Sequence, residues 1–347
     1  MLNMKFFIFG STGDLVKRKV VPALSNIFIP DLEIIALGRR DFIDESYNDF
    51  ICESGMCFNH LNKKPEYNKI DFKDKIICDK CIEELDKEKT NFFYSAMPPQ
   101  NIEIILEYVG KLKRDGFKVK ILIEKPFGRD LESAENLKNI IEKVNLVEDV
   151  FISDHYVFKD EILKLKKINF KKVKIVSLES IGLENRVGYY DSVGALKDMV
   201  QNHFLNIIFK LIDNPEEEFK DFKIIYLERA QYGNGKDIGY VKELDKNSET
   251  ETFVKIKLKT KTKEIEFITG KKFNKKISFI EIDGEKTIIN NEKNSYEVLI
   301  SEFLSKKKTN FPTVDRTILS WRIIDKIKSQ KTELKYYPEN LNVDSVV

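Results

Sequence analysis

The sequence has 347 residues, of which 42% are hydrophobic and 33% are charged. This composition is typical of a globular protein with a substantial buried core, and the length predicts two domains. Basic and acidic side chains almost cancel, leaving a formal net charge of +2, so the composition does not call for a nucleic-acid partner. No apolar run approaches the roughly 20 residues of a membrane-spanning helix, so no membrane partner is expected either.

The first half of the chain alternates short apolar runs with amphipathic helical stretches. Four of the apolar runs lie at residues 6–9, 34–37, 92–96 and 120–123. The first run reaches Gly10 too early for a signal-peptide core, so we interpret it as a buried strand of a cytoplasmic protein. The alternation predicts a Rossmann-like domain over residues 1–155, with a doubly wound parallel sheet and helices on both faces.

Four cysteines fall within this half, at Cys52, Cys57, Cys78 and Cys81. The Cys-x-x-Cys spacing of the last two could serve a zinc site or a redox pair. The looser gap between the first two fits neither a zinc ribbon nor a finger. We therefore expect reduced thiols and no metal.

The second half changes to β-rich segments, which lie at residues 173–178, 222–228, 252–258, 265–269 and 277–282. They predict an α+β domain over residues 156–347, in which a large, mainly antiparallel sheet is backed by helices. Residues 193–211 have helical periodicity and contain neither Pro nor Gly after Gly194, which predicts one long helix. The polar residues after Tyr336 predict a frayed tail.

A glycine turn follows the first predicted strand and consists of Gly10, Ser11, Thr12, Gly13, Asp14 and Leu15. Between a strand and a helix, glycines let the backbone approach a pyrophosphate, which then lies at the positive end of the helix. The turn therefore predicts a dinucleotide site. An ordinary connection between a strand and a helix is the alternative, because the spacing alone is not specific.

Arg39 follows the second predicted strand, where an NAD enzyme carries an acidic residue for the ribose hydroxyls. A guanidinium suits a 2′-phosphate, so we predict NADP as the cofactor, with a solvated surface arginine as the alternative. Two further strands end in Ala96-Met97-Pro98 and in Lys125, at the edge where open α/β sheets bind ligands. Lys125 could therefore contact cofactor and substrate alike.

Two of the three histidines stand in polar clusters, which contain Asp154, His155 and Tyr156, and Asp198, Asn202 and His203. A histidine can accept a hydroxyl proton while hydride leaves the same carbon, and a carboxylate on its other nitrogen stabilises the imidazolium. In an α-helix His203 is rotated by about 100° from Asn202, so its partner must come from elsewhere. Hydrogen-bonded core histidines are the structural alternative.

Together these segments resemble glucose-6-phosphate dehydrogenases. The shared motifs, in chain order, are Gly-Ser-Thr-Gly-Asp-Leu, Glu-Lys-Pro-Phe-Gly, Asp-His-Tyr and Asp-Met-Val-Gln-Asn-His, and the likeness extends from residue 5 to about residue 337. The resemblance implies an NADP-dependent oxidoreductase acting on CH–OH. It would oxidise D-glucose 6-phosphate to 6-phospho-D-glucono-1,5-lactone, the first step of the oxidative pentose phosphate pathway, and would form a homodimer.

The resemblance also implies a role for each candidate residue. His203 would take the proton from the C1 hydroxyl with Asp154 as its carboxylate partner, and Lys125 would bridge substrate and cofactor. The sugar would be bound by Glu179 and Asp198 at its hydroxyls, and by His155, Tyr156, Lys159, Lys271 and Lys276 at its phosphate. The cofactor would be held by Lys125, Arg39, the glycine turn at residues 10–15, and Ala96, Met97 and Pro98.

The chain departs from the family pattern at Val16, Ser153 and Phe158, and it is shortened between residues 163 and 173 and between residues 288 and 296. These differences leave the sugar preference and the dimer surface open. Two alternatives therefore remain. One is a sugar dehydrogenase of the inositol dehydrogenase type, and the other is a homologue that binds NADP with altered or absent catalysis.

Overall fold

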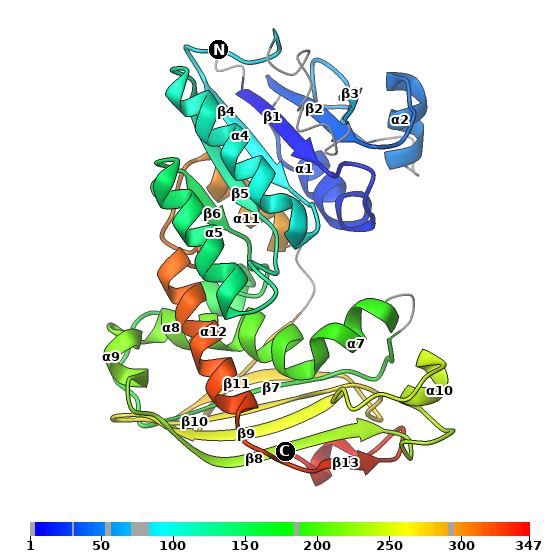
Figure 1. Cartoon of the computed structure of the whole chain (residues 1–347), viewed down its shortest axis with the longest axis vertical. Coiled ribbons are helices and arrows are strands. Elements are labelled where there is room, and N and C mark those ends of the chain that lie inside the picture. Colours follow the sequence, from blue (N-terminus) through cyan, green and yellow to red (C-terminus); the bar gives the residue numbers. More distant parts are fainter. Residues whose placement is uncertain (1–3, 30, 53–56, 71–82, 184–186, 291–294) are drawn as a thin grey trace. The chain divides into compact units, whose positions relative to one another are not determined.

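The computed structural model describes residues 4–29, 31–52, 57–70, 83–183, 187–290 and 295–347. Its contacts divide the chain into two compact units (Figure 1). The first unit comprises residues 1–158 and 294–314, and the second comprises residues 159–293 and 315–347. The break after residue 158 lies close to the division proposed between residues 155 and 156, whereas the return of residues 294–314 to the first unit was not predicted.

The first unit is built on a parallel sheet of six described strands in the order β3-β2-β1-β4-β5-β6. The strands are β1 (Met4–Phe9), β2 (Leu32–Gly38), β3 (Glu66–Lys69), β4 (Thr90–Ser95), β5 (Lys118–Ile123) and β6 (Val150–Ile152). The predicted doubly wound Rossmann-like domain is confirmed. Its central strands are apolar along most of their length because helices cover both faces of the sheet.

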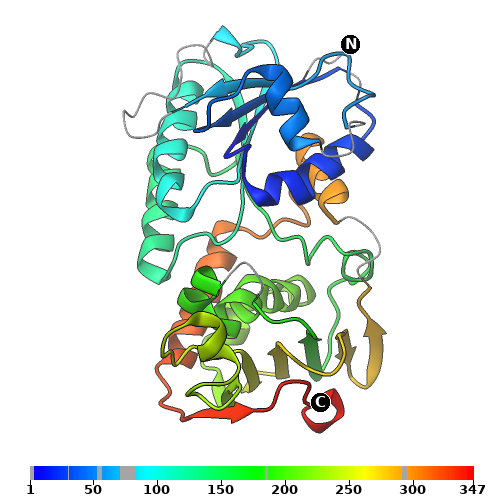
Figure 2. The ribbon, with the colours of Figure 1, turned by 90° about the vertical axis from the view of Figure 1, so that its right-hand side faces the viewer.

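The helices of the first unit form two layers. α4 (Ile102–Arg114) and α5 (Leu131–Lys143) pack against each other on one side of the sheet, and α1 (Val21–Asn26) and α11 (Ser295–Leu304) do so on the other (Figure 2). The remaining described helices are η1 (Val16–Val20), a π-helix that leads into α1, together with α2 (Asp44–Ile51) and η3 (Pro99–Asn101).

α11 contributes a central side chain to the core of the first unit. The ring of Phe303 meets the rings of Phe6, Phe92 and Phe151 edge-on, with centroids 6.3, 5.3 and 5.1 Å away. These three partners come from β1, β4 and β6, and Phe303 itself is fully buried. Aromatic packing and burial therefore explain why so late a segment belongs to the first unit.

The second unit is built on a mixed sheet of seven described strands in the order β12-β11-β7-β10-β9-β8-β13. The strands are β7 (Lys172–Leu178), β8 (Lys223–Tyr232), β9 (Phe253–Lys259), β10 (Glu264–Gly270), β11 (Ile277–Ile282), β12 (Glu285–Ile288) and β13 (Leu334–Tyr337). All neighbours are antiparallel except β7 with β10 and β8 with β13. The predicted large, mainly antiparallel sheet is confirmed.

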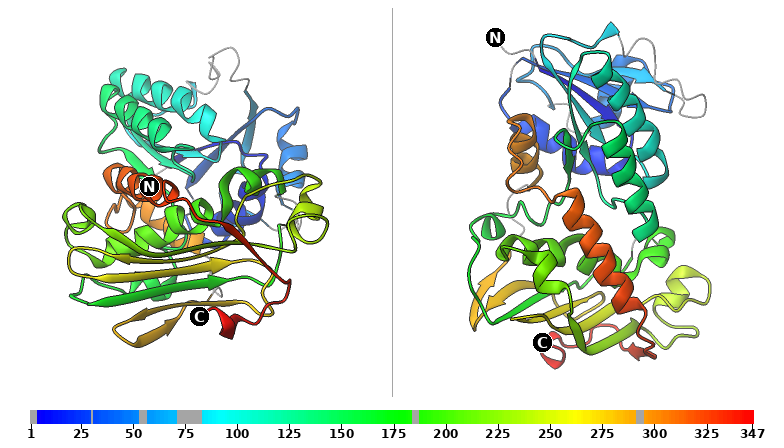
Figure 3. Two further views of the ribbon diagram at one scale, coloured as in Figure 1. Left: turned by 60° about the horizontal axis from the view of Figure 1, so that its bottom comes forward. Right: turned by 60° about the vertical axis from the view of Figure 1, so that its left-hand side comes forward.

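Helices cover one face of this sheet (Figures 1 and 3). They are α7 (Val187–Ala195), η5 (Leu196–Phe204), α8 (Leu205–Leu211) and α12 (Val314–Lys328). The shorter elements of the unit are α6 (Asp160–Leu163), α9 (Pro215–Phe219), α10 (Tyr240–Leu244) and η6 (Val343–Ser345). Because these helices cover one face of the sheet, the strand residues that point toward that face, every second one along a strand, are apolar.

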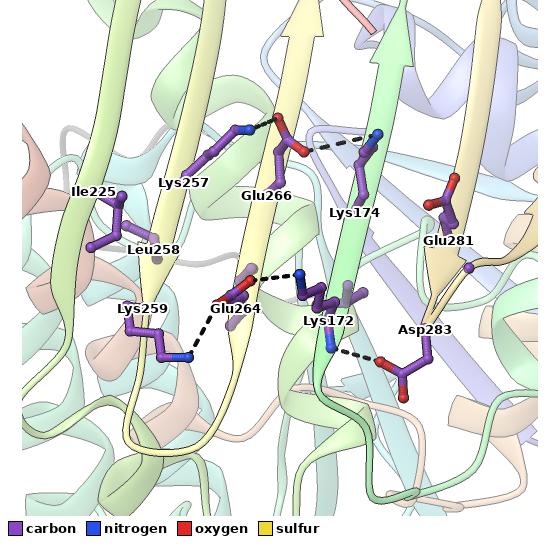
Figure 4. A pocket seen from close by; sticks show the side chains of 13 residues that line it. Lys172, Lys174, Ile225, Lys257, Leu258, Lys259, Glu264, Glu266, Glu281 and Asp283 are labelled. Atoms are coloured by element: carbon purple, nitrogen blue, oxygen red, sulfur yellow. Dashed lines mark hydrogen bonds and ion pairs between the residues drawn. The ribbon is translucent and has the colours of Figure 1, made fainter.

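The opposite face carries alternating rows of lysine and acidic side chains (Figure 4). Glu264 lies 3.3 Å from Lys172 and 3.2 Å from Lys259, and Glu266 lies 3.4 Å from Lys257. These pairs cross from strand to strand, which is the arrangement that stabilises a solvated sheet surface. These residues line a shallow pocket on this face, and their charges are paired within the sheet.

The long helix expected over residues 193–211 is continuous only in part. Gly194 has a φ of 67° and breaks the helix, and residues Leu196–Phe204 form the π-helix η5, in which the amide of Leu205 donates to the carbonyl of Val200. The expected long helix therefore runs from Leu196 to Leu211, but it does not continue across Gly194, and its first part is a π-helix. π-Helical turns are rare and occur frequently at functional sites.

The tail was also expected to be frayed, and this was wrong for its end. Val343 is buried in one apolar cluster with Phe273, Phe279 and Tyr337. The ammonium group of Lys255 donates to the carbonyl of Val346 across 2.7 Å. A few apolar residues in a polar stretch thus fix the tail against the sheet.

The cysteines differ from expectation as well. Cys52 and Cys57 are joined by a disulfide, so the prediction of reduced thiols was wrong for this pair. Cys78 and Cys81 lie outside the described residues. Among the residues that are described, no group of three or more His, Cys, Asp and Glu side chains could hold a metal ion, and no helix is long and apolar enough to cross a membrane.

Candidate active site

The candidate residues of the first unit lie at one edge of its sheet. The glycine turn follows β1, Arg39 follows β2 by one residue, Ala96 follows β4, Lys125 comes just after β5 and Asp154 just after β6. Because all these strands are parallel, their carboxyl ends meet at the same edge, where open α/β sheets bind ligands.

The glycine turn is packed too closely for larger side chains. Gly10 has a φ of +77°, and a Cβ atom there would lie 3.0 Å from both the carbonyl oxygen of Ala96 and the sulfur of Met97. The amides of Gly10 and Ser11 both donate to the carbonyl of Leu37, across 2.9 and 3.0 Å. The turn therefore lies directly between the ends of β2 and β4, and a residue larger than glycine does not fit at Gly10.

Arg39 stands beside this turn with an exposed side chain. The preceding Gly38 lets neighbours approach closely, since a Cβ atom there would lie 2.8 Å from the hydroxyl of Tyr67 and 3.1 Å from the methyl group of Thr12. Asp41, the nearby acid, forms an ion pair with Lys69. An exposed cation thus follows β2 directly, at the position where an arginine can accommodate the 2′-phosphate of NADP.

Lys125 and Asp154 form a buried ion pair. The ammonium group lies 2.9 Å from one carboxylate oxygen, and the other oxygen accepts the amide of Tyr156 across 3.1 Å. The exposed fractions of the two side chains are 10% and 0%. Burial lowers the pKa of Lys125, and the charge of Asp154 opposes that shift.

Sequence reasoning missed a second buried acid at this edge. Glu124 precedes Lys125 and accepts a short hydrogen bond from the hydroxyl of Tyr94 on β4. Burial raises the pKa of Glu124, and it also raises that of Tyr94. Glu124 stands in the Glu-Lys-Pro-Phe-Gly motif, but the sequence alone does not show that it is buried beside Tyr94.

The Asp154-His155-Tyr156 motif is packed against α11. The imidazole of His155 stacks on the ring of Tyr296 with centroids 5.6 Å apart, and it lies 5.1 Å from the ring of Tyr156. Tyr296 is buried. Nothing local to the sequence links α11 with this motif, so the contact with Tyr296 could not be predicted from the sequence.

In the second unit, Glu179 and Lys271 are brought together. They follow the parallel neighbours β7 and β10, and the ammonium group of Lys271 donates to a carboxylate oxygen of Glu179 across 2.5 Å. The same ammonium group lies 5.2 Å from the centre of the Tyr190 ring, and the lysine is buried. A residue expected to bind hydroxyls thus lies beside one expected to bind phosphate.

Asp198 and His203 lie on the π-helix η5. Each turn of a π-helix is closed by a hydrogen bond from residue i+5 to residue i, so it holds more residues than a turn of an α-helix. Asp198 and His203 are five residues apart, so they lie closer to one face than they would in an α-helix, whereas the neighbours Asn202 and His203 still point in different directions.

The remaining candidates occupy different settings. Lys159 is buried just before α6, whereas Lys276 is exposed in the connection from β10 to β11. Asp154 and His203 belong to different units, so their pairing stays a prediction.

Comparisons with known proteins agree with this arrangement. Residues 7–163 match the family model of the glucose-6-phosphate dehydrogenase NAD binding domain, and residues 158–225 match that of the C-terminal domain. Lys271 and Lys276 lie beyond the matched range of the second model.

The glucose-6-phosphate 1-dehydrogenase of Rhizobium meliloti is 33% identical over 310 residues, which cover 72% of this chain and 62% of that protein. The one from Helicobacter pylori strain J99 is 30% identical over 291 residues, which cover 73% of this chain and 68% of that protein. A solved glucose-6-phosphate dehydrogenase in complex with its substrate has a similar fold, with a TM-score of 0.78 at 21% identity over 98% of this chain and 95% of that one.

The chain thus spans less than two thirds of the length of the Rhizobium protein and slightly more than two thirds of the length of the Helicobacter protein. Both domain models and both relatives are those of glucose-6-phosphate dehydrogenases. The chain belongs to the glucose-6-phosphate dehydrogenase family.

Proposed function

We propose that this chain oxidises D-glucose 6-phosphate to 6-phospho-D-glucono-1,5-lactone, with NADP⁺ as the hydride acceptor. The observation that carries the proposal is the buried ion pair of Lys125 and Asp154. Burying two charges is expensive, and this pair stands at the ligand-binding edge of the sheet, inside two of the motifs that resemble the family. A site is therefore a better explanation of the pair than stability is.

The residues at the sheet edge fit a phosphorylated dinucleotide. Gly10 and Gly38 let the turn and the end of β2 pack closely against Ala96 and Tyr67, where added Cβ atoms would clash. We propose that residues 10–15 and Ala96, Met97 and Pro98 line the cofactor and that Arg39 binds the 2′-phosphate. When bound, NADP⁺ supplies the carbon that accepts hydride.

The proton chemistry is assigned to the chain's own side chains. We propose that His203 takes the proton of the C1 hydroxyl while hydride leaves C1, so that the alcohol becomes the lactone carbonyl. Asp154 would stabilise the imidazolium that forms. Lys125 compensates the negative charge of Asp154, which has no exposed surface of its own.

The sugar phosphate is assigned mainly to cationic and aromatic groups. Several donors are needed for a dianion, and we propose that they are His155, Tyr156, Lys159, Lys271 and Lys276. Glu179 and Asp198 would accept hydrogen bonds from the sugar hydroxyls. The pair of Glu179 with Lys271 supports this assignment, because each partner holds the other ready before substrate binds.

We propose further that the enzyme is a homodimer that works in the cytoplasm. Light scattering after size-exclusion chromatography measures the assembly. A monomeric protein would contradict the proposed dimer but would leave the proposed reaction unaffected.

NADPH formation by the purified protein tests the function. Glucose 6-phosphate with NADP⁺ should give turnover, whereas free glucose with NADP⁺, and glucose 6-phosphate with NAD⁺, should give much less. Turnover of free sugars or inositol would favour a dehydrogenase of the inositol type. NADP⁺ binding without turnover of any sugar would favour a non-catalytic homologue. The His203→Asn variant controls for contaminating dehydrogenases.

A further inference from the structure

A buried polar contact joins η5 to α12. The amide nitrogen of the Gln201 side chain donates to the hydroxyl oxygen of Ser320 across 2.9 Å. The Ser320 hydroxyl in turn donates to the carbonyl of Thr317 across 2.7 Å. Gln201 is 2% exposed and Ser320 is 1% exposed, so neither has a substantial alternative partner in water.

Buried apolar residues flank this contact on both helices. Val200 and Phe204 on η5 are fully buried, and so is Ile324 on α12. Apolar burial on each helix tolerates small rotations, because it is not directional. A hydrogen bond has a preferred distance and angle, and leaving its buried donor without a partner is unfavourable.

A second contact lies one helical turn away from the first. The ammonium group of Lys197 is 5.6 Å from the centre of the Trp321 ring. Lys197 and Gln201 are four residues apart on η5, whereas Ser320 and Trp321 are adjacent on α12. The face of η5 that bears Lys197 and Gln201 is therefore the one in contact with α12.

We infer that Gln201 and Ser320 are positioning residues, whose hydrogen bond sets the rotation of η5 and thereby aims Asp198 and His203. The inference rests on the proposed function, in which His203 is the base. Gln201 lies three residues after Asp198 and two before His203, so a rotation of the helix at Gln201 moves both. A displacement of about 1 Å at a base can reduce turnover by about 100-fold.

Three variants test the inference kinetically. Ser320→Ala removes only the hydroxyl, Gln201→Met keeps the length of the side chain without its amide, and the third variant combines both changes. Each should lower kcat for glucose 6-phosphate about 10- to 100-fold, with little change in KM for NADP⁺. The double variant should lose no more than the worse single variant, because both changes break the same bond.

The control is Ser329→Ala, since that hydroxyl also donates to a backbone carbonyl, that of Lys326, but is exposed just beyond α12. It should keep the kinetics of the unmodified enzyme. The acid limb of the pH profile of kcat/KM, which reports an essential base, should move in Ser320→Ala and stay in Ser329→Ala. Variants that melt earlier but keep kcat and this acid limb would show a merely structural bond and overturn the inference.

A second measurement does not depend on turnover. The chain has only three histidines, so the imidazole resonances of His60, His155 and His203 can be followed separately by NMR. Ser320→Ala should shift the resonances of His203 and leave those of His60 in place. An unmoved His203 would overturn the inference even if the protein had no glucose 6-phosphate activity, so this result is independent of the proposed function.

Discussion

The ammonium group of Lys125 lies 2.9 Å from a carboxylate oxygen of Asp154, and the Asp154 side chain has no exposed surface. Such a pair is unfavourable to break from one side only, because the remaining charge stays buried without compensation. The two residues also follow adjacent strands, β5 and β6. The pair thus links the stability of the first unit to its proposed chemistry.

Removing the lysine charge should destabilise the first unit strongly. Lys125→Met is expected to lower the free energy of unfolding by about 3–5 kcal/mol. The matched control is Lys138→Met, in the same unit, whose lysine pairs with Glu142 at 3.7 Å on the surface. That change should lower it by at most about 1 kcal/mol. Urea unfolding of both variants measures the difference, and equal losses would contradict a special role for the buried pair.

The proposed pairing of His203 with Asp154 can be tested without a structure of the complex. His203→Asn should reduce kcat by about 10²- to 10⁴-fold and leave sugar-phosphate binding largely intact. If the two residues act as a unit, adding Asp154→Asn to that variant should cost much less than it does in the unmodified enzyme. Multiplicative losses would show that the two residues act independently.

Arg39 should discriminate between the two nicotinamide cofactors. Arg39→Ala is expected to raise KM for NADP⁺ about 10- to 100-fold, the effect of losing one hydrogen bond to a charged group. KM for NAD⁺ should hardly change. Arg40→Ala is the control, because that guanidinium lies 5.2 Å from the centre of the Phe50 ring. A similar loss with both cofactors would remove the 2′-phosphate assignment.

Glu124 should make stability depend on pH. Burial raises its pKa above the ordinary 4.5, so the folded protein holds this proton more tightly than the unfolded chain does. The stabilisation present below pH 4.5 is therefore lost as pH rises through the folded pKa. Glu124→Gln removes this loss and keeps an oxygen that can accept from Tyr94.

Urea unfolding across this pH range tests the effect. Glu124→Gln should be more stable than the unmodified protein at neutral pH, and the advantage should shrink as pH falls toward 4.5. An advantage that is constant with pH would mean that the carboxyl does not titrate as its burial indicates.

The tail offers a simpler test of packing. Val343→Ala should lower the free energy of unfolding by about 1–3 kcal/mol, because Val343 is fully buried. Val347→Ala, four residues later and 37% exposed, should have almost no effect. Thermal denaturation distinguishes the two, and equal melting temperatures would show that the tail does not support the sheet.

Much of this arrangement could be predicted from the sequence, because it depends on local patterns. Apolar runs marked the central strands of both sheets, and polar motifs at their ends marked Lys125 and Asp154. The carboxyl ends of parallel strands share one edge, so the grouping of those motifs followed from the pattern itself.

The rest depends on contacts between distant segments or on backbone geometry. The pair of Glu179 with Lys271 requires the parallel pairing of β7 with β10, which no local pattern reveals. The π-helix η5 has the apolar periodicity of an ordinary helix, so its extra residue per turn went unseen. The buried end of the tail depends on a handful of apolar residues in a polar stretch.

The position of α11 also determines when the first unit can complete its core during synthesis. A ribosome releases the chain from its N-terminus, and domains commonly fold in that order. Here the space between Phe6, Phe92 and Phe151 is filled by Phe303, which emerges only after strands β7 to β12 have been made. The first unit must therefore wait, with aromatic surface uncovered, until most of the second has left the ribosome, and a fragment ending near residue 158 would carry that uncovered surface permanently.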